Sequence, residues 1–227
     1  MTSLNLTGTI AERLETLRAT LPPRVKLIAV TKQVSVAAMR EAYQAGVRDF
    51  GESRIQEATQ KQAELQDLPD INWHLIGHLQ SNKAKSALLL FQWIHSVDSL
   101  KLAQRLDSLA GELSCQPQVC LQVKIASDPN KFGFSVTELM ESLPALNGCQ
   151  HLQIRGLMSI PPLGLSEAET LKFFERTAEL ASKIEQQSWS HIHLQHLSMG
   201  MSEDYGLAIQ AGSTFIRLGR ALFGERT

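Results

Sequence analysis

A lysine at position 32 is the side chain best placed for covalent chemistry. It follows the apolar run Val25-Lys26-Leu27-Ile28-Ala29-Val30-Thr31, and a β-branched apolar segment of this kind is typical of a strand buried on both faces. A lysine amine that points into the mouth of a barrel is shielded from bulk water, so it can lose its proton and form a Schiff base with an aldehyde. Taken alone, Lys32 would more readily be an ordinary solvated lysine at the end of a strand.

Two segments near the C-terminus have the composition of anion-binding loops. Their small, hydroxylated or cationic residues are Ser198, Gly200, Ser202, Gly219 and Arg220. Glycines let backbone amides approach an anion closely, and serines add hydroxyl donors. Ser202 is also a candidate N-cap for a helix that begins at Glu203. Either loop alone could simply be a turn. Together with Lys32, they favour a phosphorylated aldehyde, and pyridoxal 5′-phosphate (PLP) is the common one.

Strand-like and helix-like segments alternate along the whole chain and must position these residues. The predicted strands are 25–31, 47–50, 72–76, 92–96, 118–125, 151–157, 191–196 and 214–218. The predicted helices are 36–45, 53–66, 82–89, 99–113, 136–146, 166–187, 202–210 and a short one from 220, and an extra amphipathic helix at 8–20 precedes the first strand. Eight such repeats predict an α/β fold, a (β/α)₈ TIM barrel with its site at the carboxyl ends of the strands.

An open, doubly wound sheet is the main alternative to the barrel. That fold usually carries a glycine fingerprint after its first strand, whereas this chain has Thr31-Lys32-Gln33-Val34-Ser35 there. No linker rich in proline, glycine or serine divides the sequence, so we expect one domain over residues 1–227.

The composition is that of an ordinary globular protein. The chain has 227 residues, a formal net charge of −1 and 43% hydrophobic residues, which gives no support for binding to nucleic acid. No apolar stretch reaches the ~18 to 20 residues of a membrane span, and no signal peptide is read at the N-terminus. Cys115, Cys120 and Cys149 form no paired framework, which favours a reducing compartment. We therefore expect a cytoplasmic protein.

Several motifs, in order along the chain, resemble the pyridoxal phosphate homeostasis proteins. They are Ala29-Val30-Thr31-Lys32, Phe50-Gly51-Glu52-Ser53-Arg54-Ile55-Gln56-Glu57, Trp73-His74-Leu75-Ile76-Gly77-His78-Leu79-Gln80-Ser81-Asn82-Lys83, Lys131-Phe132-Gly133-Phe134, Ile154-Arg155-Gly156-Leu157-Met158-Ser159-Ile160-Pro161, Leu197-Ser198-Met199-Gly200-Met201-Ser202 and Arg217-Leu218-Gly219. They span nearly the whole chain. The resemblance implies the barrel of the alanine racemase N-terminal domain without the second domain of that enzyme.

The resemblance also implies a cofactor site. Lys32 would carry PLP as a Schiff base, Arg217 would face its pyridine nitrogen, and the phosphate would be held by Ser198, Ser202 and the amides of Gly219 and Arg220. Met158 would lie near the cofactor ring, and His78, beyond Gly77, is a further candidate for the pocket. The family usually has asparagine where this chain has Ser53, so Ser53 could contact the cofactor or could instead cap the helix that follows.

Two kinds of function remain open at this stage. The first is a PLP-binding protein with little or no turnover, which would act in vitamin B6 homeostasis. Little turnover is expected because a racemase of this type needs a second base, a tyrosine from the second domain, and this chain has only Tyr43 and Tyr205. The alternatives are a PLP-dependent amino-acid racemase of low activity and a Schiff-base aldolase for a sugar phosphate. We expect no catalytic residue, a monomer, and apo PLP-dependent enzymes as candidate recipients.

Three histidines on one predicted strand could in principle bind a metal. His191 and His193 stand two residues apart and would share a face of the strand, with His196 further along. The sequence places no carboxylate or further histidine to complete a ligand set, so we expect no metal site.

Overall fold

The computed structural model describes residues 8–126, 128 and 131–224. The first seven residues, where we expect no signal peptide, lie outside this range. Eight strands make the central sheet: β1 Lys26–Val30, β2 Asp49–Glu52, β3 Asn72–Leu75, β4 Trp93–Val97, β5 Gln118–Lys124, β7 Gln153–Met158, β8 Ile192–Ser198 and β9 Phe215–Leu218. A two-residue strand, β6 (Phe134–Ser135), pairs with the end of β5.

The central sheet closes on itself, which confirms the predicted barrel. Every strand pairs in parallel with the next along the chain, β1 also pairs with β9, and β4 pairs with β5. The ring therefore has no free edge, and the open-sheet alternative is wrong. Parallel neighbours require long crossovers, and helices supply them.

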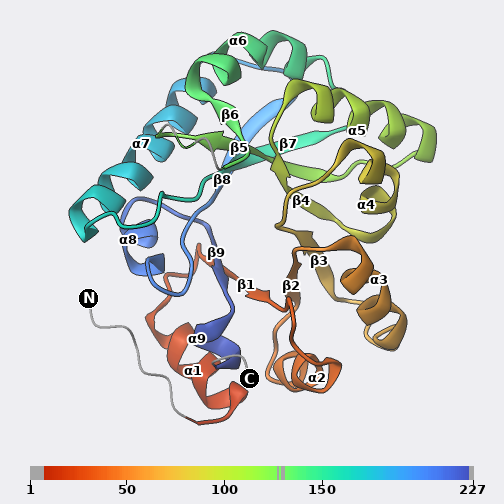
Figure 1. The fold of residues 1–227 in the computed structure, drawn as a ribbon, viewed down its shortest axis with the longest axis vertical. Coiled ribbons are helices and arrows are strands. Elements are labelled where there is room, and N and C mark those ends of the chain that lie inside the picture. The colour runs from red at the N-terminus through yellow and green to blue at the C-terminus, as the bar shows by residue number, and fades with distance from the viewer. Residues whose placement is uncertain (1–7, 127, 129–130, 225–227) are drawn as a thin grey trace.

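The helices lie around the outside of the strands (Figure 1). They are α1 Ile10–Thr20, α2 Val36–Gln44, α3 Ile55–Glu64, α4 Ala84–Leu90, α5 Leu100–Leu113, α6 Val136–Asn147, α7 Glu167–Glu185, α8 Tyr205–Gln210 and α9 Arg220–Phe223, with a 3₁₀ turn η1 at Ser81–Lys83. The extra N-terminal helix is confirmed as α1, which packs against α2 and α9. Arg13 of α1 donates a hydrogen bond to the carbonyl of Leu222 in α9. No described helix is both long and apolar enough to cross a membrane.

Local sequence explains where the longer helices begin. Ser135 precedes α6 and Ser166 precedes α7, and the side chain of each serine accepts a hydrogen bond from the amide three residues later. The residue at that third position is a glutamate, and its carboxylate accepts from the backbone amide of the serine. Such capping boxes satisfy amides that the first turn leaves unpaired. Two predicted caps are wrong: α8 begins at Tyr205 after Asp204 instead of following Ser202, and α3 begins at Ile55 after Arg54 instead of following Ser53.

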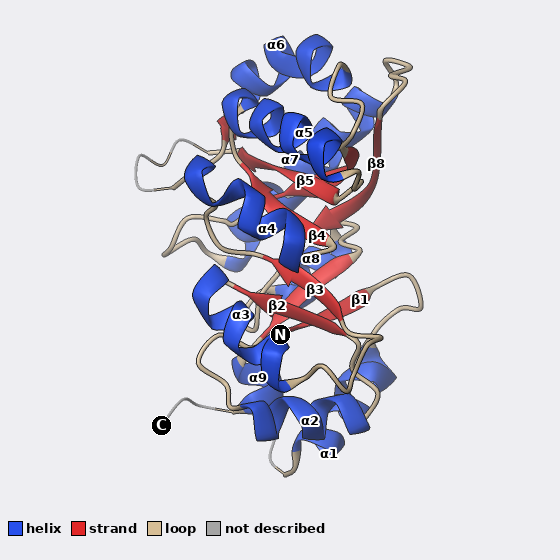
Figure 2. Ribbon diagram, turned by 90° about the vertical axis from the view of Figure 1, so that its right-hand side faces the viewer, coloured by secondary structure: helices blue, strands red, loops and turns tan. Residues whose placement is uncertain are grey.

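The core has two parts, separated by the wall of the barrel. The larger cluster packs strand residues such as Phe50 against the surrounding helices, with strands inside and helices outside in a second view (Figure 2). The smaller cluster contains Ile28, Trp93, Cys120, Met158 and Phe215. Because side chains alternate along a strand, its members mark the inward positions, and Val30 and Lys32 continue the inward series that starts at Ile28.

Candidate functional site

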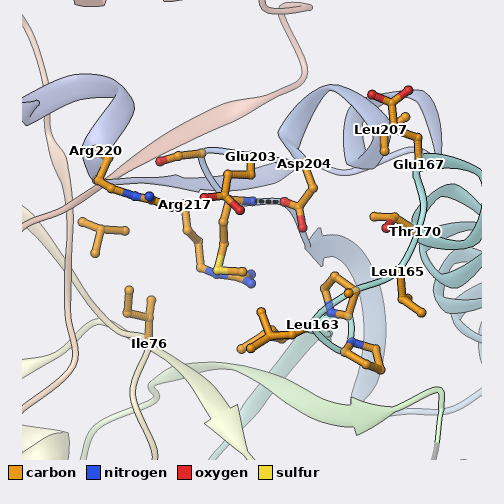
Figure 3. A pocket seen from close by; sticks show the side chains of 18 of the residues that line it. Ile76, Leu163, Leu165, Glu167, Thr170, Glu203, Asp204, Leu207, Arg217 and Arg220 are labelled. Carbon is orange, nitrogen blue, oxygen red and sulfur yellow. Dashed lines mark hydrogen bonds and ion pairs between the residues drawn. The ribbon is translucent and has the colours of Figure 1, made fainter. Parts of the chain in front are cut away.

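A pocket of about 700 Å³ opens at the carboxyl ends of the strands. This volume lies in the range of small-molecule and cofactor sites, ~300 to 1,000 Å³. Its walls come from the segments that follow β1, β2, β3, β7, β8 and β9. In Figure 3, Arg220 and Ile76 lie on one side of the pocket and Glu167, Thr170 and Leu165 on the other, with Arg217 and Asp204 between them.

Six of the nine predicted site residues line this pocket, and three do not. Those that line it are Lys32, Ser53, Ser202, Arg217, Gly219 and Arg220. Those outside its lining are Ser198, Met158 and His78. Ser198 is buried beneath Arg217, and Met158 belongs to the inner core cluster. His78 lies at the surface, where its Nδ1 is 3.0 Å from Asp98 Oδ2 and its ring stacks on Phe132 with 3.5 Å between the centroids.

Lys32 lies in a tight turn two residues beyond the end of β1. The amide of Val34 donates to the carbonyl of Thr31 at 2.9 Å, and Gln33 adopts a left-handed conformation with φ of 60°. A non-glycine residue at positive φ is uncommon and is held there by its surroundings. The side chain of Lys32 is half-buried and reaches the pocket alongside Val30.

A buried ion-pair network on the outer side of the barrel holds this turn. Lys61 of α3 donates to Glu52 Oε1 at 2.8 Å, to Glu57 Oε1 at 2.6 Å and to the carbonyl of Thr31 at 2.5 Å. Glu57 in turn accepts from the amide of Gln33 at 2.6 Å. The residues on both sides of Lys32 are therefore fixed by the network.

Glu52 is the most buried charge in this network. Its side chain is 0% exposed, and Thr31 Oγ1 donates to its Oε1 at 2.6 Å. Burial raises the pKa of Glu52, while the hydrogen bonds from Lys61 and Thr31 oppose that rise. Its second oxygen, Oε2, has no hydrogen-bond partner among the described residues. The buried negative charge of Glu52 is therefore compensated by the ammonium group of Lys61.

Arg217, on β9, is a buried cation at the base of the pocket. Its side chain donates to the carbonyl of Ser198 at 2.5 Å, to Ser198 Oγ at 2.7 Å and to the carbonyl of Ser159 at 3.2 Å. Burial lowers the pKa of Arg217 to about 10, and the nearby charge of Asp204 opposes that shift. Arg217 therefore stays protonated at neutral pH.

The loops after β8 and β9 are joined beside Arg217. Ser202 Oγ accepts from the amide of Ala221 at 3.4 Å, and the exposed side chains of Arg220 and Glu203 form an ion pair. Gly200 has a φ of +90°, and a Cβ at that position would lie 2.6 Å from Ala208 Cβ. Only glycine fits this position without strain, so Gly200 sets the path of the loop that carries Ser202.

The opposite side of the pocket was not foreseen from the sequence. The segment after β7 contributes Ile160, Pro161, Pro162 and Leu163, and Leu163 is 97% exposed. Lys131, in the loop after β5, donates to the carbonyls of Ile160 and Pro161. Burial raises the pKa of Asp204, which accepts from the amide of Met201 at 2.6 Å. One side of the pocket thus carries Arg220 in its ion pair with Glu203, and the opposite side is apolar apart from Glu167 and Thr170.

Neither tyrosine lines the pocket. Tyr43 lies near the end of α2 and donates to Asp70 Oδ1 at 2.5 Å. Its ring lies under the guanidinium of Arg48. Tyr205 begins α8 and packs against the outer core. Among the described residues, no group of three or more histidine, cysteine or acidic side chains is arranged to hold a metal ion.

The residues present fit a phosphorylated aldehyde. A lysine amine, a buried guanidinium, a serine hydroxyl and a loop with Gly219 all face one concave space. Guanidinium and serine groups are donors that suit anionic or lone-pair oxygen and nitrogen atoms. A pocket with these donors can bind an anion at one end and a carbonyl carbon beside Lys32.

Comparison with known proteins agrees with this geometry. Residues 7–227 match the family model described as the alanine racemase N-terminal domain. The chain is 52% identical over 208 residues to the pyridoxal phosphate homeostasis protein of Synechocystis, covering 92% of this chain and 94% of that protein. It is 38% identical over 208 residues to the protein of the same name from Escherichia coli K12, covering 90% and 87% of the two chains.

Solved structures show the same relation. PipY of Synechococcus elongatus PCC7942, solved with PLP bound, superposes with a TM-score of 0.91 at 55% identity, covering 95% of this chain and all of that one. Alanine racemase of Clostridium difficile 630 superposes with a TM-score of 0.78 at 16% identity, and the match covers 96% of this chain but 57% of the racemase. At that identity the likeness concerns the fold alone.

Proposed function

This chain belongs to the pyridoxal phosphate homeostasis protein family, and from that membership we propose that it binds PLP as a Schiff base on Lys32 and acts in vitamin B6 homeostasis. The observation that carries the proposal is the meeting of Lys32, Arg217, Ser202 and Gly219 in one pocket. The PLP bound to PipY, at 55% identity, supports the choice of ligand.

Each residue of the pocket has a separate task in this proposal. Lys32 supplies the amine, and its turn is fixed by Lys61 and Glu57. Ser202 with the amides of Gly219 and Arg220 holds the phosphate, and Ser53 borders the ring. PLP itself supplies a reactive aldehyde and an aromatic ring that withdraws electrons.

We further propose that the protein turns over amino acids slowly or not at all. Arg217 faces the ring nitrogen and donates a hydrogen bond, but a guanidinium keeps its proton. A ring nitrogen that stays unprotonated withdraws electrons weakly. No tyrosine lines the pocket in the described residues to act as a second base opposite Lys32. The protein would therefore hold a reactive aldehyde safely and release it to other proteins.

Two measurements separate this proposal from a slow racemase. Titration of the purified protein with PLP should show saturable binding near one equivalent, and loss of α-deuterium from labelled amino acids should stay at the rate of free PLP. Racemisation well above that rate would establish an enzyme instead. We also propose a cytoplasmic monomer of one domain, with apo PLP-dependent enzymes as recipients. Sedimentation would test the monomer, and activation of an apo-enzyme by the loaded protein would test transfer.

A further inference from the structure

A chain of hydrogen bonds runs through the inside of the barrel and ends at Arg217. Asp49 Oδ1, at the start of β2, is 3.0 Å from His74 Nε2. His74 Nδ1 is 2.9 Å from His95 Nε2, and His95 Nδ1 is 2.8 Å from Ser198 Oγ. Arg217 then donates to that same hydroxyl at 2.7 Å. The chain joins the amino ends of the strands to the base of the pocket.

The hydrogens of this chain can be assigned from its two ends. The carboxylate of Asp49 only accepts and the guanidinium of Arg217 only donates. A neutral imidazole has one donor and one acceptor nitrogen. Asn72 Nδ2 also lies 3.1 Å from His74 Nε2, but it donates to Asp49 Oδ1 at 2.8 Å, which leaves His74 Nε2 as a second donor to that carboxylate. His95 Nε2 then donates to His74 Nδ1. His95 Nδ1 is left as an acceptor, so the hydroxyl of Ser198 donates to it and accepts from Arg217.

The surroundings keep both histidines neutral and Asp49 charged. Burial lowers the pKa of His74 and lowers that of His95 well below its ordinary value. Burial alone would raise the pKa of Asp49, but hydrogen bonds from His74 and Asn72 bring it below the ordinary value. Asp49 also borders an outer cleft of about 410 Å³ and is 20% exposed. All hydrogens in the chain thus point away from the pocket.

The two histidine rings are also fixed by aromatic packing. His74 stacks on Trp93 at 5.9 Å between centroids with 9° between the planes, and His95 meets Phe215 edge-on at 5.5 Å. Both side chains are fully buried. Rings held on their faces and bonded at both nitrogens cannot flip without breaking two hydrogen bonds.

We propose that His95 and His74 are positioning residues that orient Arg217 toward the ligand's ring nitrogen. The order of the chain makes Ser198 Oγ an acceptor for Arg217, which also donates to the carbonyls of Ser198 and Ser159. The guanidinium is thus held at the lining of the pocket, with N–H groups left for a ligand. This inference deepens the proposed function and rests on it for the identity of the ligand. The orientation of the hydrogens, in contrast, is a property of the protein alone.

The ligand-free protein gives the first test. Nitrogen-15 NMR should show both His74 and His95 protonated on Nε2, with Nδ1 unprotonated. In the unmodified protein, His95 should keep this state from pH 6 to 8. Protonation of either histidine on Nδ1 would overturn the inference. This result does not depend on whether the protein binds PLP.

The second test uses two ligands that differ only at the ring nitrogen. Probes are PLP and its benzenoid analogue, in which a C–H group replaces that nitrogen. His95→Phe keeps a flat aromatic ring, one atom larger than imidazole, and removes both hydrogen bonds. We expect it to weaken PLP binding at least tenfold while binding of the analogue changes less than threefold. Ser198→Ala, a smaller change, should do the same and serves if His95→Phe fails to fold.

His196 provides the matched control. It is another inward histidine and stacks on Phe215 at 4.5 Å, but its Nδ1 faces Thr214 Oγ1 at 3.2 Å, outside the chain. His196→Phe should leave the preference for PLP over the analogue unchanged. Equal losses for both ligands in His95→Phe would show a merely structural role and overturn the inference. Failure of the unmodified protein to bind PLP would instead overturn the proposed function.

Discussion

Removing Lys61 should destabilise the protein strongly and loosen the turn that carries Lys32. In Lys61→Met, Glu52 loses its buried partner and the carbonyl of Thr31 loses a donor at 2.5 Å. Breaking a buried ion pair by removing one partner costs about 3–5 kcal/mol. In a chain of this length, about 1 kcal/mol lowers Tm by about 2–4 °C, so the expected drop is about 6 to 20 °C.

Thermal unfolding followed by circular dichroism would measure this drop. Arg40→Met is the matched control, because it breaks an exposed pair with Asp67 at 2.6 Å, and such pairs contribute about 0–1 kcal/mol. The double variant Lys61→Met/Glu52→Gln should recover much of the loss, since the fully buried carboxylate of Glu52 is gone and only the partly exposed one of Glu57 remains. A Lys61→Met protein as stable as Arg40→Met, or a double variant less stable than Lys61→Met, would refute the reasoning.

Two further predictions concern the loop after β8 and the interior histidines. Gly200→Ala should lower the free energy of unfolding by at least about 1–3 kcal/mol, from strain at positive φ. Gly148→Ala, at a φ of −78°, should lower it less, because its only close contact would be the carbonyl oxygen of Ala145 at 3.2 Å; equal urea midpoints for the two variants would contradict this. Because burial lowers the pKa of His74 and His95, the unfolded chain binds more protons below pH of about 6.5. Stability should therefore be intact above that pH and fall by up to about 1.4 kcal/mol per pH unit for each histidine as the pH drops. Urea unfolding at several pH values should show a shallower slope for His95→Phe, and an unchanged slope would contradict the assignment.

The barrel could be predicted because its strands are buried on both faces. Segments such as Leu27–Val30, in which Ile28, Ala29 and Val30 are buried, give continuous apolar runs that a sequence pattern detects. Helix starts were predictable at Ser135 and Ser166, where a glutamate follows at the third position. Ser202 lacks that glutamate, since Tyr205 stands at the third position, and its predicted cap failed because Asp204 accepts from the amide of Met201 and the helix begins only at Tyr205.

Residues that depend on register between distant strands could not be predicted. Lys61 and Glu57 have the spacing of an exposed helical pair, and nothing local shows that Glu52 lies beneath them. His74 and His95 are 21 residues apart and meet only because β3 and β4 are neighbours. A glutamate at the end of a buried strand and histidines at inward positions were the available signals, and neither specifies a partner.

The central claim, a Schiff base on Lys32, is tested most directly by borohydride reduction of the protein loaded with PLP. The loaded protein should be yellow, its visible band should bleach on reduction, and the added mass should map to the peptide that contains Lys32. Lys32→Ala should remain colourless and take up no such mass, while Lys83→Ala, on the 3₁₀ turn η1, should behave like the unmodified protein. A stable adduct on another lysine, or an unlabelled Lys32 in protein saturated with PLP, would contradict the account.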